Sequence, residues 1–581
     1  MAKYNVVVLK VQDGELVDFE DKSNDEKKAL NLQNAIYIYR GTKHKKVYIG
    51  QTIHFINRHK QHYSGSEEKF NNADFNEVMV VFSQYFNRSA LDDVESQLIT
   101  YFLADKIKNV TYDNDEVINR TSGNSVNEYT EREKVAFEVI LPLWEDVLYP
   151  RKWVATKSLN DIRTRALVKY SPIKVLTAEQ GELISEIIDN TTKNYVINGD
   201  AGTGKTVLLT HLVANILENR PNARVGVVVQ PNWERIGSDI FEVYGMNNSR
   251  LSVLTSTKLI NSQENYDVIV VDEAHKMSRK YGKQHPSFGQ VYDIDEFENC
   301  ESHLEIIQKL GKQIILMYDV LQAIRPANVT RETFQALTSD YERRFLTTQF
   351  RIQPPEGKNY TSDDYINGIK YLLYKDTGLL DSHLTNFNPN FNHEVFKDKS
   401  QDAYFGYVTE QPLHNLIDWL ERDVNFNPEH INRILAGLVE EWQQKDGKDP
   451  NITHWHEGDI KRRWNSTQEN WINSNEPDAA EQIGSVFAVQ GIDLNKVGVL
   501  IGADLQVGPD GKLVGNPANF YNTNGVFTRA EMEEKENKFE FTLFVLNIYY
   551  VLLTRGIDGI RIGFWHNDEF RKYMEETLEI K

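Results

Sequence analysis

A glycine-rich stretch of eight residues carries the plainest chemical signal in the chain. Residues 199–206 read Gly-Asp-Ala-Gly-Thr-Gly-Lys-Thr and lie between a predicted strand and a predicted helix. Glycines let backbone N–H groups approach phosphates, and the start of the helix adds positive potential. The lysine would meet the β- and γ-phosphates of a nucleotide, and the last threonine would ligate Mg²⁺. The predicted phosphate-binding residues are Gly199, Gly202, Thr203, Gly204, Lys205 and Thr206.

Two acids follow an apolar strand later in the chain. Val268–Val271 leads directly into Asp272 and Glu273. In parallel sheets, ligands bind at the carboxyl ends of the strands. Asp272 would hold Mg²⁺ through water, and Glu273 would polarise the attacking water. Together with the glycine-rich loop, the pair predicts binding and hydrolysis of ATP, and a surface Asp-Glu pair is the simpler alternative.

A second set of polar side chains lies nearer the N-terminus. Tyr37 and Tyr48 fall on two short predicted strands. Arg58 and His62, four residues apart, share one face of the next predicted helix, and Glu95 lies on an amphipathic helix further on. A guanidinium stabilises phosphate through paired N–H donors, and a carboxylate suits Mg²⁺ or Mn²⁺. The set predicts chemistry on a phosphodiester, and tyrosines that only pack a core are the simpler alternative.

This ordered set resembles the GIY-YIG endonuclease family over about residues 33–125. The two signature tripeptides are Ala35-Ile36-Tyr37 and Tyr48-Ile49-Gly50, so alanine stands where the family has its first glycine. The resemblance implies that the glutamate binds one divalent cation, the arginine stabilises the pentacovalent phosphate, and a tyrosine acts as general base or positions water, with histidine assisting. The implied catalytic residues are Tyr37, Tyr48, Arg58, His62, Glu95 and Asn119. A nuclease fold retained only for binding is an open alternative.

From about residue 173 to residue 570 the chain resembles superfamily-1 helicases with two RecA-like lobes, in particular the bacterial family related to the C-terminal ATPase of Schlafen proteins. The segments that carry this resemblance are Leu176–Gln180, Tyr318–Ala323, Gln349–Arg351, Val489–Asp493 and Tyr550–Gly556. In the fourth segment, aspartate replaces the usual glutamate. The resemblance implies that Thr177 and Gln180 read the adenine base. It implies that Gln322 senses the γ-phosphate, that Gly491 makes contacts in the cleft, and that Arg351 and Arg555 are the two arginine fingers.

Composition limits the class of protein. A length of 581 residues indicates about three domains. The net charge of −20 argues against a basic coat, but not against a local nucleic-acid patch. The single cysteine, Cys300, excludes an intramolecular disulfide and a cysteine-rich zinc site. Since no signal-peptide layout and no apolar run of ~20 residues occurs, we expect a cytoplasmic protein without membrane contact.

The predicted fold class is α/β: a small mixed α/β domain followed by two RecA-like lobes with parallel sheets. Continuous apolar strands alternate with helices from Leu176 onward, as in sheets covered on both faces. Late strands are expected at Gly484–Phe487, Val497–Ile501 and Gly559–Phe564. We assign a nuclease-like domain at 1–125, a helical connector at 126–170, and lobes at 171–355 and 356–581. Four tryptophans in a polar stretch, Trp442, Trp455, Trp464 and Trp471, suggest an accessory helical insertion at about 405–480.

The main functional hypothesis is an ATP-dependent helicase or translocase with its own metal-dependent endonuclease. ATP and Mg²⁺, or Mn²⁺ at the nuclease site, are the expected cofactors, and nucleic acid is the expected partner, with DNA favoured over RNA. Defence against invading DNA, such as phage, is an analogy with other nuclease–motor fusions, and DNA repair is its nearest variant. A nucleotide-gated switch whose N-terminal domain only binds nucleic acid or a partner is the alternative from another class, and ATP that restrains cutting is a third. Self-association or a partner protein is left open.

Overall fold

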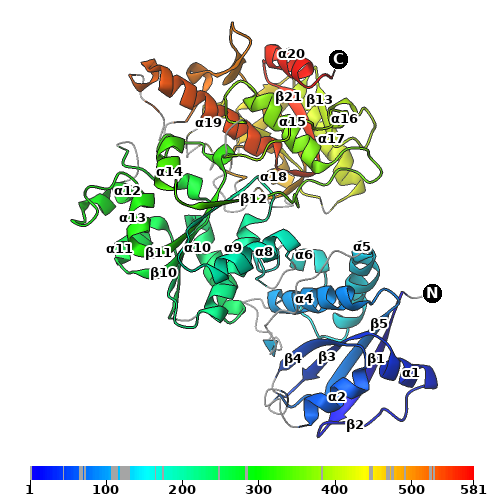
Figure 1. The fold of residues 1–581 in the computed structure, drawn as a ribbon. Helices are drawn as coiled ribbons and strands as arrows, with labels where there is room; N and C mark the ends of the chain where they lie inside the picture. Colours follow the sequence, from blue (N-terminus) through cyan, green and yellow to red (C-terminus); the bar gives the residue numbers. More distant parts are fainter. Residues whose placement is uncertain are drawn as a thin grey trace. The chain divides into compact units, whose positions relative to one another are not determined.

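The computed structural model describes most of the chain (Figure 1). The described residues are 3–43, 45–64, 70, 73–105, 116–117, 131–163, 165–172, 176–246, 249–281, 286–380, 384–428, 430–441, 443, 446, 449, 451–465, 472, 477–489, 492–522, 527 and 530–580. The chain divides into two compact units. One comprises 1–192, 206–255 and 266–268, and the other 193–205, 256–265 and 269–581.

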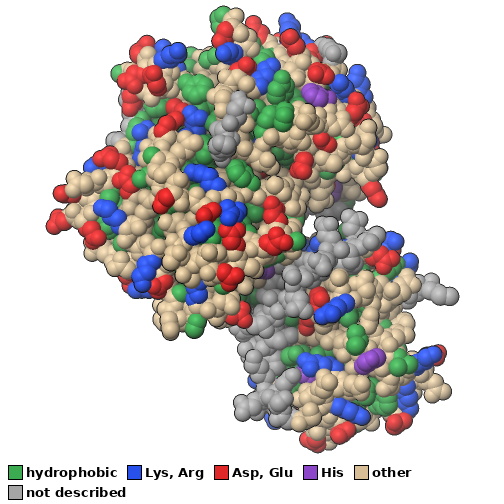
Figure 2. Space-filling view, viewed as in Figure 1, with side chains coloured by type: hydrophobic (Ala, Val, Ile, Leu, Met, Phe, Trp, Pro, Cys, Tyr) green, Lys and Arg blue, Asp and Glu red, His purple; other side chains and the backbone are tan. Residues whose placement is uncertain are grey.

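The surface carries both signs of charge. On the face drawn in Figure 2, acidic and basic side chains are interspersed, and neither sign forms a continuous patch there. Within the described ranges, every helix is too short or too polar to cross a bilayer. Any contact with a polyanion on that face would therefore depend on a few local cations rather than on the overall charge.

The N-terminal domain is built on a six-stranded sheet of order β2-β1-β5-β3-β4-β6. Its first hairpin turns at Asp13-Gly14, and Ser23 caps the first helix. The strands are β1 (Tyr4–Gln12), β2 (Glu15–Leu16), β3 (Ala35–Gly41), β4 (Lys46–Thr52), β5 (Glu77–Ser83) and β6 (Glu116–Val117). The helices are α1 (Asn24–Leu32), α2 (Phe55–Tyr63) and α4 (Arg88–Ala104).

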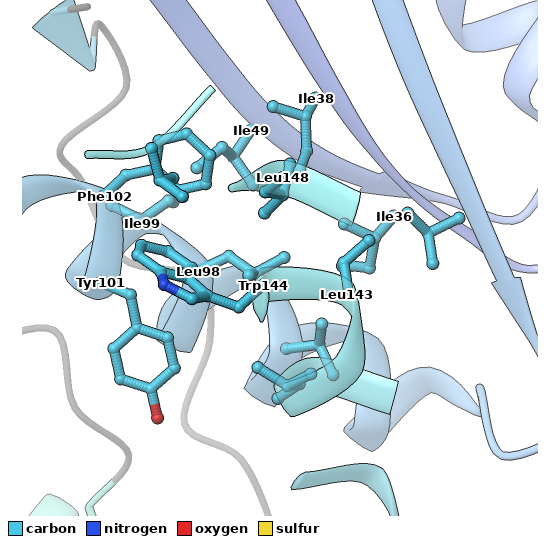
Figure 3. Close-up of a cluster of buried hydrophobic side chains, with 14 of the residues drawn as sticks. Ile36, Ile38, Ile49, Leu98, Ile99, Tyr101, Phe102, Leu143, Trp144 and Leu148 are labelled. Atoms are coloured by element: carbon cyan, nitrogen blue, oxygen red, sulfur yellow. The ribbon is translucent and has the colours of Figure 1, made fainter. Parts of the chain in front are cut away.

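Alternation along β3 places its side chains in two different cores. Tyr37 and Tyr39 pack into the core on the α2 side, whereas Ile36 and Ile38 pack into the core on the α4 side. In Figure 3, residues of β3 and β4 meet Leu98, Ile99 and Phe102 of α4 and the side chains of Leu143, Trp144 and Leu148. Both faces of this sheet are thus covered, which fixes the register of the strands that carry the two tyrosines.

The expected connector is helical and is part of the domain's core. It contains α5 (Arg132–Val135), the π-helical turns η1 (Ala136–Ile140) and η2 (Leu143–Leu148), α6 (Leu159–Arg163) and α7 (Ala166–Lys169). Trp144 is fully buried, and its indole N–H donates to the carbonyl oxygen of Thr156 at 3.0 Å. The segment therefore packs as a fixed layer on α4 and is not an independent spacer.

The second sheet has the order β12-β7-β11-β10-β8-β9. β7 pairs in parallel with β11 and β12, and β8 pairs in parallel with β9. The strands are β7 (Tyr195–Gly199), β8 (Val225–Val228), β9 (Leu251–Leu254), β10 (Tyr266–Val271), β11 (Gly311–Tyr318) and β12 (Glu342–Leu346). The helices are α8 (Ala178–Asp189), α9 (Lys205–Asn219), α10 (Pro231–Val243), α11 (Ser256–Ser262), η3 (Ala274–Lys276), α12 (Pro286–Gly289), η4 (Gln290–Asp293), α13 (His303–Leu310), η5 (Val320–Gln322) and α14 (Arg331–Leu337).

The third sheet has seven strands in the order β13-β21-β18-β14-β17-β16-β15, parallel except for the terminal hairpin. Its strands are β13 (Phe405–Val408), β14 (Arg433–Ala436), β15 (Trp455–Glu457), β16 (Ile460–Trp464), β17 (Gln482–Gly484), β18 (Leu494–Ile501) and β21 (Gly556–Phe564), and a separate ribbon joins β19 (Leu505–Val507) to β20 (Leu513–Gly515). The helices are α15 (Ser362–Tyr374), α16 (Glu394–Lys397), α17 (Pro412–Phe426), α18 (Pro477–Ala480), η8 (Pro517–Asn519), η9 (Glu531–Glu533), α19 (Lys535–Leu553) and α20 (Asp568–Thr577).

The expected accessory helical insertion at about 405–480 is wrong. That stretch supplies strands β13 to β16 of the third sheet, together with α17 and α18. Trp455 and Trp464 lie on the β15–β16 hairpin with ring centroids 5.4 Å apart, and Trp455 also packs on Trp565. Cross-strand aromatic packing therefore extends the sheet, and the strand expected at Gly484–Phe487 lies two residues earlier, as β17. Trp442 and Trp471 lie outside the described residues.

A buried carboxyl group in the second lobe makes stability depend on pH. Asp504 is fully buried, and burial raises its pKa to about 7 although the hydrogen bond from the Tyr549 hydroxyl lowers it. Its pKa is thus higher in the folded chain than in the unfolded chain, so stability is lost as pH rises through about 7. We expect the stability gained by Asp504→Asn to be about 2 kcal/mol greater at pH 8 than at pH 5, measured by calorimetric unfolding. An equal effect at both pH values would contradict this assignment.

Candidate active sites

A close approach of two strands places the first tyrosine of the nuclease-like site. Tyr37 on β3 is the register partner of Gly50 on β4. A Cβ atom at Gly50 would lie 2.4 Å from both the Cζ atom and the hydroxyl oxygen of Tyr37. The Tyr48 ring stacks beside the Tyr37 ring, with centroids 6.2 Å apart. Gly50 is therefore needed for space, because the Tyr37 ring crosses over the backbone of β4.

Gly50→Ala is expected to disturb both packing and cleavage. The added methyl group must push the Tyr37 ring or β4 aside, and such overpacking costs about 1–3 kcal/mol. We expect a lower melting temperature and slower strand cleavage, with ATP hydrolysis retained. Gly181→Ala in α8 is the matched control, because a Cβ atom there meets nothing within 4 Å. Wild-type cleavage by Gly50→Ala would show that Tyr37 need not hold this position.

Helix α2 supplies the partners of the Tyr37 hydroxyl. The Nε2 atom of His62 lies 2.9 Å from that oxygen, and the Nε atom of Arg58 donates to it at 3.4 Å. Phe70 stacks flat against the His62 imidazole at 4.1 Å between centroids. Burial raises the pKa of Tyr37 well above its ordinary value, with Tyr48 raising it further and Arg58 lowering it. The phenol therefore keeps its proton in this state and can orient water, whereas His62 can accept a proton.

The carboxylate of the site comes from α4. The side-chain amide of Gln51 donates to the Oε2 atom of Glu95 at 2.9 Å and also to the Oδ1 atom of Asp92. Burial raises the pKa of Glu95 to about 7, the Gln51 hydrogen bond lowers it, Asp92 raises it and Arg58 lowers it. Two acids held by one amide form a pair whose negative charge a cation would stabilise. Glu95 and Arg58 also act on Tyr37, because the charge of Arg58 lowers the pKa of its hydroxyl group and the charge of Glu95 raises it.

The structure brings together five of the six residues expected for the nuclease chemistry, and Asn119 lies outside the described residues. Among the described residues, no group of three or more His, Cys, Asp or Glu side chains lies close enough together to hold a metal ion. A cation beside Glu95 would therefore take one or two protein carboxylates, and water and phosphate oxygens would complete its shell. This donor set fits a hard divalent ion that also binds the substrate.

Sequence reasoning missed several residues around this site. Asp92 precedes Glu95 by three positions, so that both lie on one helix face, and Gln51 directly follows the second signature tripeptide. The Tyr39 hydroxyl lies 2.7 Å from the Nδ1 atom of His59, whose Nε2 atom lies 3.0 Å from the carbonyl oxygen of Gly14. Strand and helix periodicity could have placed these residues near the site, but not their pairing.

The glycine-rich loop holds its own lysine. The Lys205 ammonium donates to the carbonyl oxygens of Gly199 at 2.5 Å and Asp200 at 3.1 Å, and lies 3.8 Å from a carboxylate oxygen of Asp319. Gly202 and Gly204 have φ values of 85° and 79°, the left-handed conformation that glycine adopts without strain. Thr203 donates its hydroxyl to the Asp200 carbonyl, and Thr206 lies in the first turn of α9. These contacts give the shape of a phosphate-binding loop with its lysine directed inward.

The two acids after β10 have opposite protonation tendencies. Burial and the neighbouring Glu273 raise the pKa of Asp272 to about 7. Although burial opposes it, the charges of Lys276 and His275 hold the pKa of Glu273 well below its usual range, and the Nε2 atom of His275 lies 2.8 Å from Glu273. Glu273 is also in the left-handed backbone region, with φ 52°. A cation near Asp272 would favour its ionised form, as expected for a Mg²⁺ site.

The sensor segment lies against the same loop. Gln322 donates its amide to Asp319 at 2.6 Å, and Asp319 caps the short helix η5 by accepting from the backbone N–H of Leu321. Since Asp319 also faces Lys205, a γ-phosphate that drew the lysine away would leave this carboxylate to rearrange with Gln322. Thr177 and Gln180 form a reciprocal capping box at the start of α8, with both hydrogen bonds at 3.2 Å.

One expected arginine finger lies beside the loop but is paired elsewhere. Gln349 donates to the carbonyl oxygen of Ala201 at 2.8 Å, and the N–H of Phe350 donates to that of Gly202. The Nε atom of Arg351 instead bonds the carboxylate of Asp493 at 2.5 Å. The second finger, Arg555, is buried and donates to the carbonyl oxygen of Ile492 at 3.5 Å. Gly491 lies outside the described residues.

A further pair ties the loop to the second lobe, and sequence reasoning did not find it. The ammonium of Lys370 on α15 is fully buried and lies 2.7 Å from the Asp200 carboxylate. It also donates to the carbonyl oxygen of Asn386, and the Tyr550 hydroxyl donates to Asp200 at 3.3 Å. Nothing local in the sequence distinguishes Lys370 from other lysines, because its partner is 170 positions away.

A phosphate-binding loop on one parallel sheet, two arginines in the segments that follow β12 and precede β21, and a tyrosine–arginine–glutamate site on the N-terminal domain define a helicase-type ATPase fused to a nuclease. Family comparison agrees: residues 192–566 match the model described as Schlafen group 3, DNA/RNA helicase domain, and residues 33–108 match the GIY-YIG catalytic domain. The chain belongs to the Schlafen group 3 helicase family and carries a GIY-YIG nuclease domain. These families generally use ATP and a divalent metal.

Individual relatives are distant. The uncharacterized protein YPL245W of Saccharomyces cerevisiae is 24% identical over 482 residues, which cover 71% of this chain and 93% of that protein. The helicase domain of Hef from Pyrococcus furiosus is 10% identical, with a TM-score of 0.29, over 68% of this chain and 96% of that one. Mss116p bound to single-stranded RNA is 12% identical, with a TM-score of 0.33, over 70% of this chain and 73% of that one.

Proposed function

We propose that this enzyme uses ATP hydrolysis to move along nucleic acid and cuts it at the Glu95 site. The observation that carries the proposal is the convergence of Tyr37, Arg58, His62 and Glu95 on one small domain of a chain that also belongs to a helicase family. DNA is the proposed substrate rather than RNA. Defence against invading DNA is the proposed role, by analogy with nuclease–motor fusions, and DNA repair is its variant.

At the ATPase site, we assign one role to each residue expected from the sequence. Lys205 leaves the carbonyl oxygens of its own loop to meet the β- and γ-phosphates, and Glu273, ionised at neutral pH, orients and polarises the attacking water. Thr206 and Asp272 would hold Mg²⁺, which neutralises phosphate charge, while Thr177 and Gln180 would contact adenine. Gln322 and Gly491 would read the γ-phosphate side of the cleft. Arg351 and Arg555 stabilise charge that develops on the transferred phosphoryl group.

At the nuclease site, side chains of the protein position a phosphodiester for attack by water. Arg58 donates to the scissile phosphate, and the protonated Tyr37 hydroxyl orients the nucleophilic water, whose proton His62 accepts. Glu95, with Asp92 nearby, would hold Mg²⁺ or Mn²⁺, which supplies Lewis-acid stabilisation when bound. The Tyr48 ring stacks on the Tyr37 ring and limits its movement, and Asn119 would complete the site.

Lys205→Ala separates the competing functions. We expect its ATP hydrolysis to fall to background, because no other cation on the loop can meet the β- and γ-phosphates. The measurement is cleavage of labelled single- and double-stranded DNA and RNA with Mg²⁺ or Mn²⁺, with and without ATP. If ATP drives cutting, the variant loses the stimulation; if ATP restrains cutting, the variant cuts more than wild type when ATP is present.

A nucleotide-gated switch is the second candidate. It would hydrolyse ATP, and its N-terminal domain would bind nucleic acid or a partner protein without cutting. Absence of cleavage by the wild-type chain on all four substrates with either metal would favour it. Sedimentation of the chain with and without nucleic acid tests whether a second copy joins the active form.

A further inference from the structure

A cavity of about 390 Å³ lies on the side of α4 away from the nuclease site. Its walls come from α4, from the connector segments α5, η1, α6 and α7, and from Ser171. Cavities of about 300–1,000 Å³ are the size class that binds small organic molecules. An isolated inorganic anion would leave most of this volume empty, so the cavity has room for a ligand with an organic part.

The α4 residues that face the cavity point away from Glu95. At roughly 100° per residue, Asp93, Gln97 and Thr100 project about 140–200° around the helix axis from position 95. Their side chains belong to the cavity wall, and none of them is part of the proposed nuclease chemistry. The cavity is therefore a separate feature that shares one helix with that site.

Three cations line the cavity against one carboxylate. Arg132, Arg163 and Lys169 carry the positive charge, and Asp93 the negative. Asp93 is fully buried and already satisfied: one oxygen lies 3.2 Å from Arg132, and the other accepts from Gln97 at 2.9 Å. Lys169 has no ion-pair partner among the described residues. The surplus of positive charge favours an anionic ligand.

The other side chains that line the cavity suit an aromatic ring and the hydroxyl groups of a sugar. Two aromatic side chains line the cavity: Phe137, which is 62% exposed, and Tyr101, which is 5% exposed and presents only a small part of its ring. The Arg163 guanidinium lies 5.8 Å from the Tyr101 ring centroid and donates to the Tyr101 hydroxyl at 3.2 Å. Hydroxyl groups line it too, with the Thr100 and Ser171 oxygens 3.3 Å apart. Aromatic faces bind bases by stacking, and guanidinium groups bind phosphate.

We propose that this cavity binds a nucleoside 5′-phosphate, with the phosphate on Arg163 and Lys169 and the base against the exposed face of Phe137. The site is distinct from the glycine-rich loop and from the Glu95 site. Binding requires neither ATP hydrolysis nor strand cleavage, so its test is independent of the function proposed above. Because α4 carries Glu95 on its other face, the ligand would contact the helix that positions that carboxylate.

The test is a titration of the full-length chain carrying Lys205→Ala, so that the glycine-rich loop contributes little. AMP, GMP, CMP, UMP and inorganic phosphate are each measured by calorimetry. We expect at least one of the four nucleotides to bind more tightly than phosphate. Adding Lys169→Glu should weaken that binding about tenfold or more, the loss of one charge-assisted contact. Adding Lys157→Glu, an exposed charge change on the connector outside the cavity, should leave it unchanged.

A second measurement needs no cavity variant. Hydrogen exchange of the Lys205→Ala chain should slow in α4 and α7 when the nucleotide that bound in the titration is added. No binding by any of the four nucleotides, affinity equal to that of phosphate, or equal binding with Lys169→Glu and with Lys157→Glu would overturn the proposal. Protection confined to α9 and the glycine-rich loop before it would overturn the proposal as well, since it would place the nucleotide at the ATPase site.

Discussion

A Glu95→Gln chain is expected to hydrolyse ATP at the wild-type rate and to leave labelled nucleic acid uncut. Glutamine keeps the size of the side chain but removes the negative charge that would hold the cation. The loss should be at least about 10³-fold in cleavage rate, equivalent to about 4 kcal/mol of transition-state stabilisation. Single-turnover cleavage with Mg²⁺ or Mn²⁺ and a coupled ATPase assay on the same preparation measure both activities.

Asp92→Asn is the comparison variant for Glu95. Both acids accept from the Gln51 amide, so both substitutions alter the same hydrogen-bond network. A smaller loss with Asp92→Asn than with Glu95→Gln would assign metal binding to Glu95 and a supporting position to Asp92. Cleavage by Glu95→Gln within a few-fold of wild type would remove the carboxylate from the mechanism.

Arg351→Ala is expected to lower the turnover number for ATP by about 10³-fold or more, the range measured for arginine fingers in comparable enzymes. Nucleotide affinity should change much less, because the guanidinium acts on charge that develops only in the transition state. The readout is kcat together with the equilibrium binding of a non-hydrolysable ATP analogue.

Two further variants make the Arg351 result specific. Arg351→Lys keeps the charge but loses the planar fork, so it should recover only part of the rate. Arg344→Ala removes a half-exposed arginine on β12 that pairs with Glu342, and it should leave hydrolysis unchanged. Equal turnover in Arg351→Ala and wild type would show that Arg351 stays on Asp493 throughout the cycle.

Much of both sites could be predicted from the sequence because short motifs fix local geometry. A strand, a glycine-rich turn and a helix start must bring Lys205 inward, and an i, i+4 pair must place Arg58 and His62 together. The two strand tyrosines and Glu95 followed from the resemblance to the GIY-YIG family, and the predicted strands and amphipathic helix gave the elements that carry them. The glycine-rich loop, the acids after β10 and the described residues of the nuclease cluster therefore lie on the elements expected for them.

What the sequence could not provide are partners chosen by tertiary packing. Gln51 bridges Asp92 and Glu95 from another element, and Lys370 meets Asp200 across 170 positions. The error at about 405–480 has the same origin: Trp455 and Trp464 lie in a polar stretch that suggested an accessory helical insertion, and only their cross-strand packing shows that they belong to the sheet. Local patterns report periodicity and turn chemistry, whereas these contacts depend on which surfaces meet after folding.

The bond between Lys370 and Asp200 has a mechanical consequence. The glycine-rich loop is joined to β7 and to α9 at its two ends, and this ion pair also fixes it to a helix of the opposite lobe. Removing either partner would deprive the other of its ion pair in a largely buried place, so the pair holds the loop and α15 at a fixed separation. A displacement of α15 would therefore be passed directly to the glycine-rich loop, through the Lys370 ammonium and the Asp200 carboxylate.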